Sequence, residues 1–291
     1  MADQILRATG EIVELRFVLI DATAAANEIA DMHHALGFAR VLLGETLTSA
    51  LILASGLKTN GTIQTQFQFS GDLSLVAADA TPMGLVRARL PREEVLKIGE
   101  FEPLLSPLKM LVRKLDDQGR RIAESIVEMP SEKIGLSTAF YLLQSEQTRS
   151  AVGIKALAHP DGKSLKFCGG FLVEAFPKAD EKTISIMEQV VRHLPDLGEF
   201  AFKEKDGLNL PELLSQLAGP FRTTVHREIE VKAFCPCSEK GMIKALNGLP
   251  KLDLEDIVSK NETLELHCEY CRKRYLATPN HIREILKNLG S

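Results

Sequence analysis

Residues 63–90 read IQTQFQFSGDLSLVAADATPMGLVRARL, and this stretch decides the fold class. Its first seven residues alternate strictly, which places Ile63, Phe67 and Phe69 on one face of a strand and glutamines on the other. The turn sequences SGD at 70–72 and TPMG at 81–84 then separate two further apolar runs. The stretch therefore predicts a three-stranded antiparallel meander.

Segments on both sides of the meander add strands and helices. The additional strands are expected at 11–20, 108–115, 121–129, 151–158 and 164–176. Helices are expected at 22–36, at 41–57 and from an N-cap at Ser131 to about residue 147. Glu45 and several Thr and Ser residues interrupt the apolar run 41–57, so we expect a buried helix and not a membrane span. Residues 1–177 are thus predicted to be an α+β domain with an antiparallel sheet and helices.

Beyond Pro177 the pattern becomes helical and amphipathic. The apolar residues that gather on one face of the first helix are Ile184, Met187, Val190, Val191 and Leu194. A second helix is expected to begin at the cap Asn209 and to end at Gly219 and Pro220. Residues 178–231 are therefore interpreted as an amphipathic helical linker, whose simplest role is to pack against the α+β domain.

Composition excludes several classes of protein. The chain has 291 residues, 45% of them hydrophobic and 25% charged, which is typical of a globular protein with more than one domain. A formal net charge of −4 argues against a general nucleic-acid-binding protein. The N-terminal residues MADQ begin no secretory signal, so a cytoplasmic protein without a membrane partner is expected.

Four of the five cysteines crowd into the C-terminal segment 232–291. Cys235 and Cys237 form a CxC pair, and Cys268 and Cys271 form a CxxC pair. Two such pairs can close a tetrahedron of thiolates around one Zn²⁺ ion and leave no open position for a reacting water. We therefore predict a small Cys₄ zinc domain at 232–291, with one zinc per chain and His267 as a neighbour and not a ligand.

Other interpretations of the cysteines remain open. An iron–sulfur cluster ordinarily uses different spacings. A purely structural zinc site could belong to a regulator or nucleic-acid-binding module, although 232–291 contain ten Lys and Arg against eight Asp and Glu. A thiol–disulfide oxidoreductase built on the CxxC pair would need a βαβ frame that this region lacks. The fifth cysteine, Cys168, is predicted to be a buried strand residue without a redox role.

The four thiolates also suit a redox switch. Zinc holds sulfurs about 2.3 Å from the metal and apart from one another, whereas a disulfide needs about 2.05 Å between them. Oxidation must therefore expel the metal. Arg272, Lys273 and Arg274 follow Cys271 and place positive charge near the thiolates, which favours their reactive ionised form. The alternative interpretation is a basic run that is simply solvated.

The cysteine pattern, followed by Arg272-Lys273-Arg274-Tyr275, resembles the redox switch of the heat-shock protein 33 family, the 33-kDa redox-regulated chaperonins. The resemblance covers essentially the whole chain. It is also carried by the total length and by the segments LG at 43–44, SEQ at 145–147 and GGFL at 169–172. Cys168 and Glu45 depart from the family pattern, which makes the large domain divergent.

The resemblance implies a holdase chaperone and not an enzyme. In that family the reduced, zinc-bound form is inactive, and oxidation releases zinc, unfolds the switch and linker, and produces a dimer that binds unfolding proteins. Carried over to this chain, the implied metal ligands are Cys235, Cys237, Cys268 and Cys271, and the implied disulfides are Cys235–Cys237 and Cys268–Cys271. The implied setting is the cytoplasm under oxidative or heat stress, with a homodimer in the oxidised state and no nucleic-acid or membrane partner.

Overall fold

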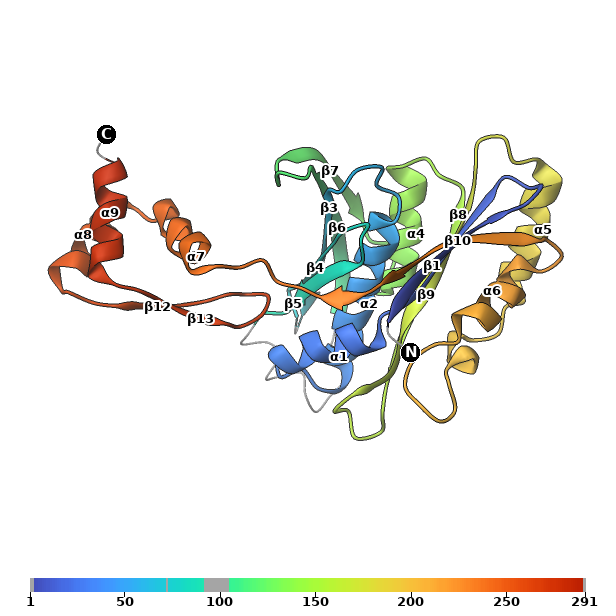
Figure 1. Cartoon of the computed structure of the whole chain (residues 1–291), viewed down its shortest axis with the longest axis horizontal. Coiled ribbons are helices and arrows are strands. Elements are labelled where there is room, and N and C mark those ends of the chain that lie inside the picture. The colour runs from blue at the N-terminus through green and yellow to red at the C-terminus, as the bar shows by residue number, and fades with distance from the viewer. Residues whose placement is uncertain (1–2, 72, 92–104, 290–291) are drawn as a thin grey trace. The chain divides into compact units, whose positions relative to one another are not determined.

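The structure is a computed structural model that describes residues 3–71, 73–91 and 105–289. It contains two compact units, residues 1–234 and 235–291 (Figure 1). Residue 72, which belongs to the first turn expected in the meander, lies outside the described residues. The chain has the α+β class that the sequence predicts, with sheets that are antiparallel except for one short parallel pair, helices and a small cysteine-bearing unit in the C-terminal part.

The first sheet has five antiparallel strands in the order β10-β1-β2-β9-β8. They are β1 Gln4–Gly10, β2 Leu15–Asp21, β8 Ser150–Ala158, β9 Leu165–Ala175 and β10 Thr223–Glu230. Strands β2 and β9 are buried on both faces, because Val18 and Ile20 enter one hydrophobic core while Phe17 and Leu19 enter another. This double burial explains why both segments are continuous apolar runs and do not alternate.

Gly169 and Gly170 of β9 allow the two strands that pair with it, β2 and β8, to approach closely. A Cβ atom on Gly169 would lie 2.1 Å from the carbonyl oxygen of Ile20 on β2. A Cβ atom on Gly170 would lie 2.2 Å from the carbonyl oxygen of Gly153 on β8. Both positions therefore require glycine.

The second sheet has six strands in the order β11-β5-β4-β3-β6-β7. They are β3 Thr62–Gly71, β4 Leu75–Ala80, β5 Leu85–Arg89, β6 Leu105–Leu115, β7 Arg121–Glu128 and the short β11 Lys232–Ala233. The expected meander is confirmed, since β3 pairs antiparallel with β4 and β4 with β5. In β3 the side chains of Ile63, Phe67 and Phe69 are buried as the alternation predicts.

Helices α1 Thr23–Met32, α2 Gly37–Ala54 and α4 Ile134–Gln144 complete the first core. Helix α2 contacts strands of both sheets and is the central helix of this unit (Figure 1). It is long and apolar enough to cross a membrane by length and composition, but 78% of it is buried inside the protein. The expectation of a buried helix is therefore confirmed, with bounds that begin four residues earlier than the apolar run suggests.

The other face of the five-stranded sheet is covered by α5 Glu181–Arg192, the 3₁₀ helix η1 Leu197–Phe200 and α6 Leu210–Ala218. The Asp180 side chain caps α5 by accepting a hydrogen bond from the Thr183 backbone N–H. Asn209 caps α6 in the same way, as predicted. Together with Phe17, Phe171 and other sheet residues, the apolar faces of these helices form a second, separate core.

Three expectations of local structure are wrong. Residues 223–230 are strand β10 and not part of a helical linker; β10 pairs along β1, so sheet hydrogen bonding decides its conformation. Residues 11–14 form a bend, and the strand starts at Leu15. Ser131 does not cap α4, because the N-cap residue of that helix is Lys133. The Ser131 hydroxyl instead accepts a hydrogen bond from the Lys133 backbone N–H.

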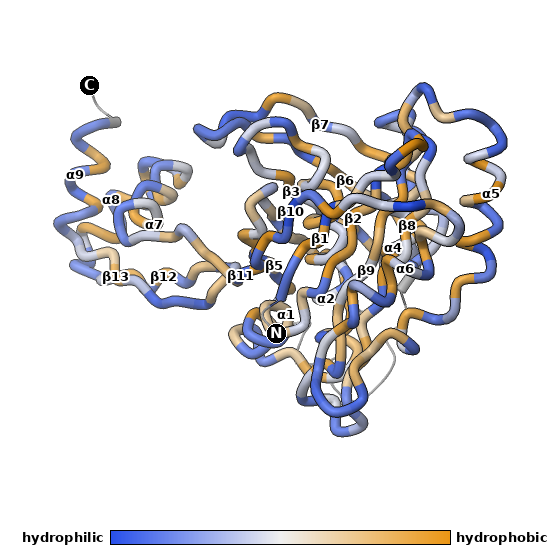
Figure 2. Tube along the Cα trace, turned by 45° about the vertical axis from the view of Figure 1, so that its right-hand side comes forward, coloured by the Kyte–Doolittle hydropathy of each residue, from blue (hydrophilic) through white to orange (hydrophobic). Residues whose placement is uncertain are grey.

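The second unit is small. Its elements are α7 Glu239–Ala245, η2 Leu246–Gly248, α8 Lys251–Ser259, β12 Leu264–His267, β13 Arg274–Ala277 and α9 Pro279–Leu289. Helix α9 alternates hydrophilic and hydrophobic residues along its trace (Figure 2). The buried core described for this unit consists of Leu246, Leu254, Ala277, Ile282 and Ile285. So few buried side chains provide limited stability unless a bound metal or another cross-link also stabilises the unit.

Glu45 predicts a specific pH dependence of stability in the first unit. Glu45 lies on α2, and its burial raises the pKa of its carboxyl to about 7. The Ala156 backbone N–H, which donates to the carboxylate, and the nearby charge of Lys155 both lower this pKa but do not outweigh the burial. A raised pKa means that the folded state prefers the protonated acid, so its stabilising contribution is present below about pH 4.5 and is lost as the pH rises through about 7. We expect Glu45→Gln, measured by urea unfolding, to be more stable than the wild type at pH 8 by up to about 3 kcal/mol, with the difference vanishing near pH 4.5. Glu28→Gln, at an exposed position of α1, is the matched control; the same gain at both pH values would contradict the assignment.

Candidate metal centre

The four C-terminal cysteines are presented by two different kinds of backbone. Cys235 and Cys237 lie in an irregular segment between β11 and α7. The Ser238 hydroxyl accepts a hydrogen bond from the Gly241 backbone N–H and so fixes the start of α7. The second pair, Cys268 and Cys271, lies in the turn of the β12–β13 hairpin.

The turn that carries the second pair is tight. The Cys268 backbone N–H donates to the carbonyl oxygen of Lys273 at 3.0 Å, and the Arg272 N–H donates to the carbonyl oxygen of Cys268 at 2.9 Å. Arg272 adopts a φ of 59°, in the left-handed region that closes such turns. These bonds direct both thiols of the hairpin to the same side.

The structure brings all four predicted cysteines together. Their sulfur atoms lie within 4.8 Å of one another. The Sγ atoms of Cys235 and Cys268 are 3.6 Å apart, and those of Cys237 and Cys271 are 3.3 Å apart. A tetrahedron with Zn–S bonds of about 2.3 Å has sulfur–sulfur edges of about 3.8 Å, so the observed cluster has the size of a Cys₄ site.

The four thiols differ in their environments. Burial raises the pKa of Cys235, and it raises the pKa of Cys271 to about 12. Burial acts in the same direction on Cys237, but hydrogen bonds from the Tyr275 hydroxyl and the neighbouring cysteines outweigh it and lower the pKa to about 7. One thiol is therefore easily ionised, while others need the charge of a bound cation to remain thiolates.

The charged residues near the cysteines are largely paired with one another. The Nε2 atom of His267 lies 2.6 Å from a carboxylate oxygen of Glu265, and Arg274 forms an ion pair with the same carboxylate at 2.7 Å. Lys273 places its Nζ atom 5.4 Å from the centre of the Tyr275 ring. Among the described residues, the group that can hold a metal consists of the four cysteines, without His267.

The fifth cysteine lies elsewhere, in β9 of the first unit. Cys168 is fully buried in the first core, and its burial raises the pKa of its thiol far above the ordinary value. Gly44 of α2 leaves room for it, because a Cβ atom there would lie 2.9 Å from the Cys168 Sγ atom. The position agrees with the expectation of a buried strand cysteine that behaves as a small apolar side chain.

Fold and site together define a class: an α+β protein with two apolar cores that ends in a small unit built around four cysteines. The chain belongs to the family described as "Hsp33 protein", whose model matches residues 3–278. The resemblance in the cysteine pattern is thereby confirmed.

Individual relatives match the chain over nearly its whole length. It is 30% identical over 300 residues to a protein of Desulfotalea psychrophila named 33 kDa chaperonin, with 99% of both chains covered. A protein of Bacillus subtilis with the same name is 28% identical over 291 residues, covering 96% of this chain and 97% of the relative. The crystal structure of the 33 kDa chaperonin from Thermotoga maritima has the same fold, with a TM-score of 0.81 and 22% identity, covering 100% of this chain and 99% of that chain.

Proposed function

We propose that this protein is a redox-regulated chaperone of the holdase type. Its reduced, zinc-bound form is inactive, and its oxidised form binds unfolding proteins and prevents their aggregation during oxidative or heat stress. Membership of the Hsp33 family and the names of the curated relatives support a chaperone. The cluster of four sulfurs supports a metal centre that oxidation can dismantle.

One observation carries the proposal: α5 and α6 cover an apolar face of the five-stranded sheet. Leu210, Leu213 and Leu217 of α6 are fully buried there against sheet residues that include Phe17 and Phe171. If 178–231 loosen, the helices and the sheet expose two complementary apolar surfaces at once. A holdase chaperone binds unfolding proteins through large exposed apolar surfaces and does not need a nucleotide.

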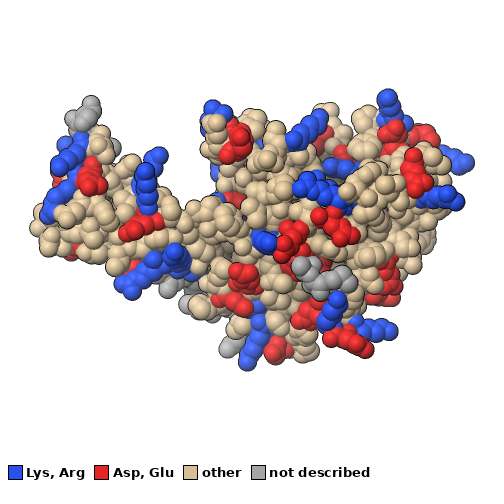
Figure 3. All heavy atoms as spheres, viewed as in Figure 1, with Lys and Arg blue, Asp and Glu red and all other residues tan. Residues whose placement is uncertain are grey.

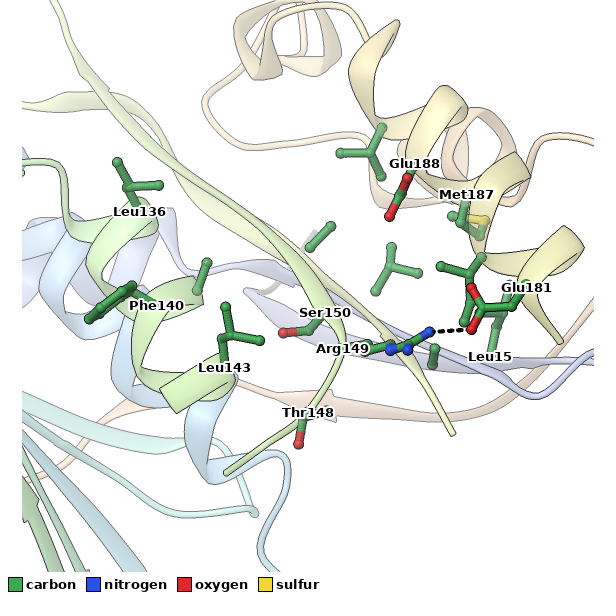
Figure 4. A pocket seen from close by; sticks show the side chains of 16 residues that line it. Leu15, Leu136, Phe140, Leu143, Thr148, Arg149, Ser150, Glu181, Met187 and Glu188 are labelled. Carbon is green, nitrogen blue, oxygen red and sulfur yellow. Dashed lines mark hydrogen bonds and ion pairs between the residues drawn. The ribbon is translucent and has the colours of Figure 1, made fainter. Parts of the chain in front are cut away.

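Helix α5 is packed loosely on the side that faces α4. A cleft of about 630 Å³ separates the two helices and reaches the ends of β8 and β9 (Figure 4). Leu136 and Leu143 of α4 line it and are each about half exposed, while Met187 lines it from α5. At its edge Arg149 and Glu181 form an exposed ion pair, which contributes little to stability. The structure therefore supports an α5 that detaches more readily than the rest of the first unit.

The second unit supplies the proposed trigger. Bound zinc would keep the four sulfurs as thiolates and stabilise a unit whose own core is small. On oxidation, Cys235 with Cys237 and Cys268 with Cys271 would each form a disulfide, and the Zn²⁺ ion would be released. Each pair of thiolates would give two electrons to one hydrogen peroxide molecule, which would take up two protons from the solvent and leave as two water molecules. Sulfurs bonded in this way no longer serve as a set of four ligands. Residues 232–234 connect the unit directly to β10 and hence to the linker, so unfolding can propagate along the chain.

The proposed partners are unfolding client proteins and, in the oxidised state, a second copy of the chain. We propose a cytoplasmic protein that is not an enzyme and has neither nucleic-acid nor membrane partners. On the face shown in Figure 3, Lys and Arg side chains are interspersed with Asp and Glu. This arrangement does not favour the alternative of a nucleic-acid-binding protein with a structural zinc, which ordinarily presents a basic patch.

An aggregation assay tests the proposed function. We expect protein treated with peroxide at mildly raised temperature to suppress light scattering by a thermally unfolding client at near-equimolar ratio, and reduced zinc-loaded protein to have little effect. Re-reduction with zinc should restore the inactive state. Equal suppression by both forms would contradict redox control, and the absence of suppression in both would contradict the holdase.

Peptide mapping of the oxidised sample tests the disulfide pairing. It should show bonds within each pair and not Cys235–Cys268 or Cys237–Cys271, although the sulfurs of those cross pairs are also close.

A further inference from the structure

Tyr275 makes a contact that crosses the metal centre. Its hydroxyl oxygen lies 3.1 Å from the Sγ atom of Cys237. Tyr275 belongs to β13, in the hairpin that carries Cys268 and Cys271, whereas Cys237 belongs to the other pair. The contact therefore joins the two halves of the site by a side chain that is itself not among the four cysteines.

The direction of this hydrogen bond follows from the chemistry of the site. A cysteine that ligates a metal is a thiolate and carries no proton, so its sulfur can only accept. The tyrosine hydroxyl must then be the donor. Tyr275 as a whole residue is 8% exposed.

The segment that carries Cys237 is held at its ends, where the Phe234 backbone N–H donates to the Val86 carbonyl oxygen and the Ser238 hydroxyl accepts from the Gly241 N–H. Residues 234–238 form neither helix nor strand, whereas the second pair is held by the backbone bonds of the hairpin turn. A ligand on an irregular segment loses conformational entropy when it binds a metal, unless a neighbouring group already restrains it. The Tyr275 hydroxyl is placed to provide that restraint.

We infer that Tyr275 is a positioning residue of the metal centre: its hydroxyl donates to Cys237 and holds the CxC pair in place against the hairpin that carries the CxxC pair. The inference rests on the zinc centre proposed above and adds a specific residue that governs how tightly the metal is retained. Loss of an outer partner of a metal ligand ordinarily weakens metal affinity by about 10–100-fold. Zinc retention in turn sets how readily the switch opens.

The chain offers a clean substitution and a matched control. Tyr275→Phe removes the hydroxyl and keeps the ring, including its position about 5.4 Å from the Lys273 ammonium group. Tyr270→Phe removes a hydroxyl from the tyrosine between Cys268 and Cys271, in the turn of the hairpin whose strand β13 carries Tyr275. Both variants should retain the buried core of the second unit, because neither changes an apolar contact.

The experiment measures zinc affinity of the full-length reduced protein by competition with a chromophoric chelator. We expect Tyr275→Phe to bind zinc about 10–100-fold more weakly than the wild type and Tyr270→Phe to bind like the wild type. In protein loaded with Co²⁺, the sulfur-to-cobalt charge-transfer band should move to lower energy in Tyr275→Phe alone, because a thiolate without its donor holds its electrons less tightly. A role confined to packing would leave that band in place.

Equal zinc affinities and identical bands in the wild type and Tyr275→Phe would overturn the inference. An effect of the same size in Tyr270→Phe would overturn it as well, because it would show a general sensitivity of the turn. Failure of the zinc centre itself is distinguishable, since the wild type would then bind neither metal.

Discussion

Replacing any one of Cys235, Cys237, Cys268 or Cys271 by Ala is expected to abolish tight zinc binding and to unfold residues 235–291. Four sulfurs within 4.8 Å of one another complete the coordination of one ion, and three leave it open to water. Zinc binding contributes about 10–16 kcal/mol of apparent free energy to small modules of this kind, more than a core of five buried residues can replace. Elemental analysis of the reduced protein should give one zinc per wild-type chain and a small fraction of that in each variant.

Cys168→Ser is the control for this series. Cys168 is fully buried in the first unit and shares a contact with the Thr48 hydroxyl, which can accept or donate a hydrogen bond to a serine. We expect full zinc content in Cys168→Ser. Undiminished zinc in any of the four alanine variants, or loss of zinc in Cys168→Ser, would contradict the assignment of ligands.

Leu213→Asp is expected to make the reduced, zinc-loaded protein an active holdase. Leu213 is fully buried between α6 and the five-stranded sheet, and a carboxylate at this position without a partner costs several kcal/mol. That cost falls on the second core, which is separate from the core around α2, so α6 should detach while the first core stays folded. Light scattering of a thermally unfolding client should then fall without any oxidant, and the zinc content should stay at one per chain.

Ser215→Asp introduces the same charge on the exposed side of α6 and should leave the reduced protein inactive. Hydrogen exchange provides the structural readout: residues 181–218 should lose protection in Leu213→Asp and keep it in Ser215→Asp. If Leu213→Asp opens these residues and still fails to protect the client, the covered sheet face is not the holding surface. Such a result would not bear on the metal centre, because neither substitution changes one of its four cysteines.

The metal centre was largely predictable because its signal is local. Two pairs of cysteines within 37 residues of sequence have few other uses in a reducing compartment, and the structure brings all four together. Tyr275 belongs to the pattern that carries the family resemblance, but its spacing indicates no role for it. Its contact with Cys237 spans 38 residues and depends on how the hairpin meets an irregular segment, which spacing does not encode.

The fold divides in a similar way. Strict alternation in residues 63–69 predicted a half-buried antiparallel strand, because period-two patterning follows from the pleat itself. Residues 223–230 offer no comparable signal: six of these eight residues are exposed, and pairing with β1 across more than 200 residues makes them a strand. A strand of this kind is decided by a partner edge and not by its own side chains.

The α+β class, the meander, the buried helix, the cap at Asn209 and the four cysteines of the metal centre could be predicted from the sequence alone, since each depends on side chains close together along the chain. Only the tertiary structure decided that β2 and β9 are buried on both faces, that α5 and α6 close a second core over the sheet, and that a tyrosine hydroxyl reaches one of the cysteines. Those features depend on which surfaces meet after the chain has folded, and contacts between residues far apart in sequence leave no periodic trace in it.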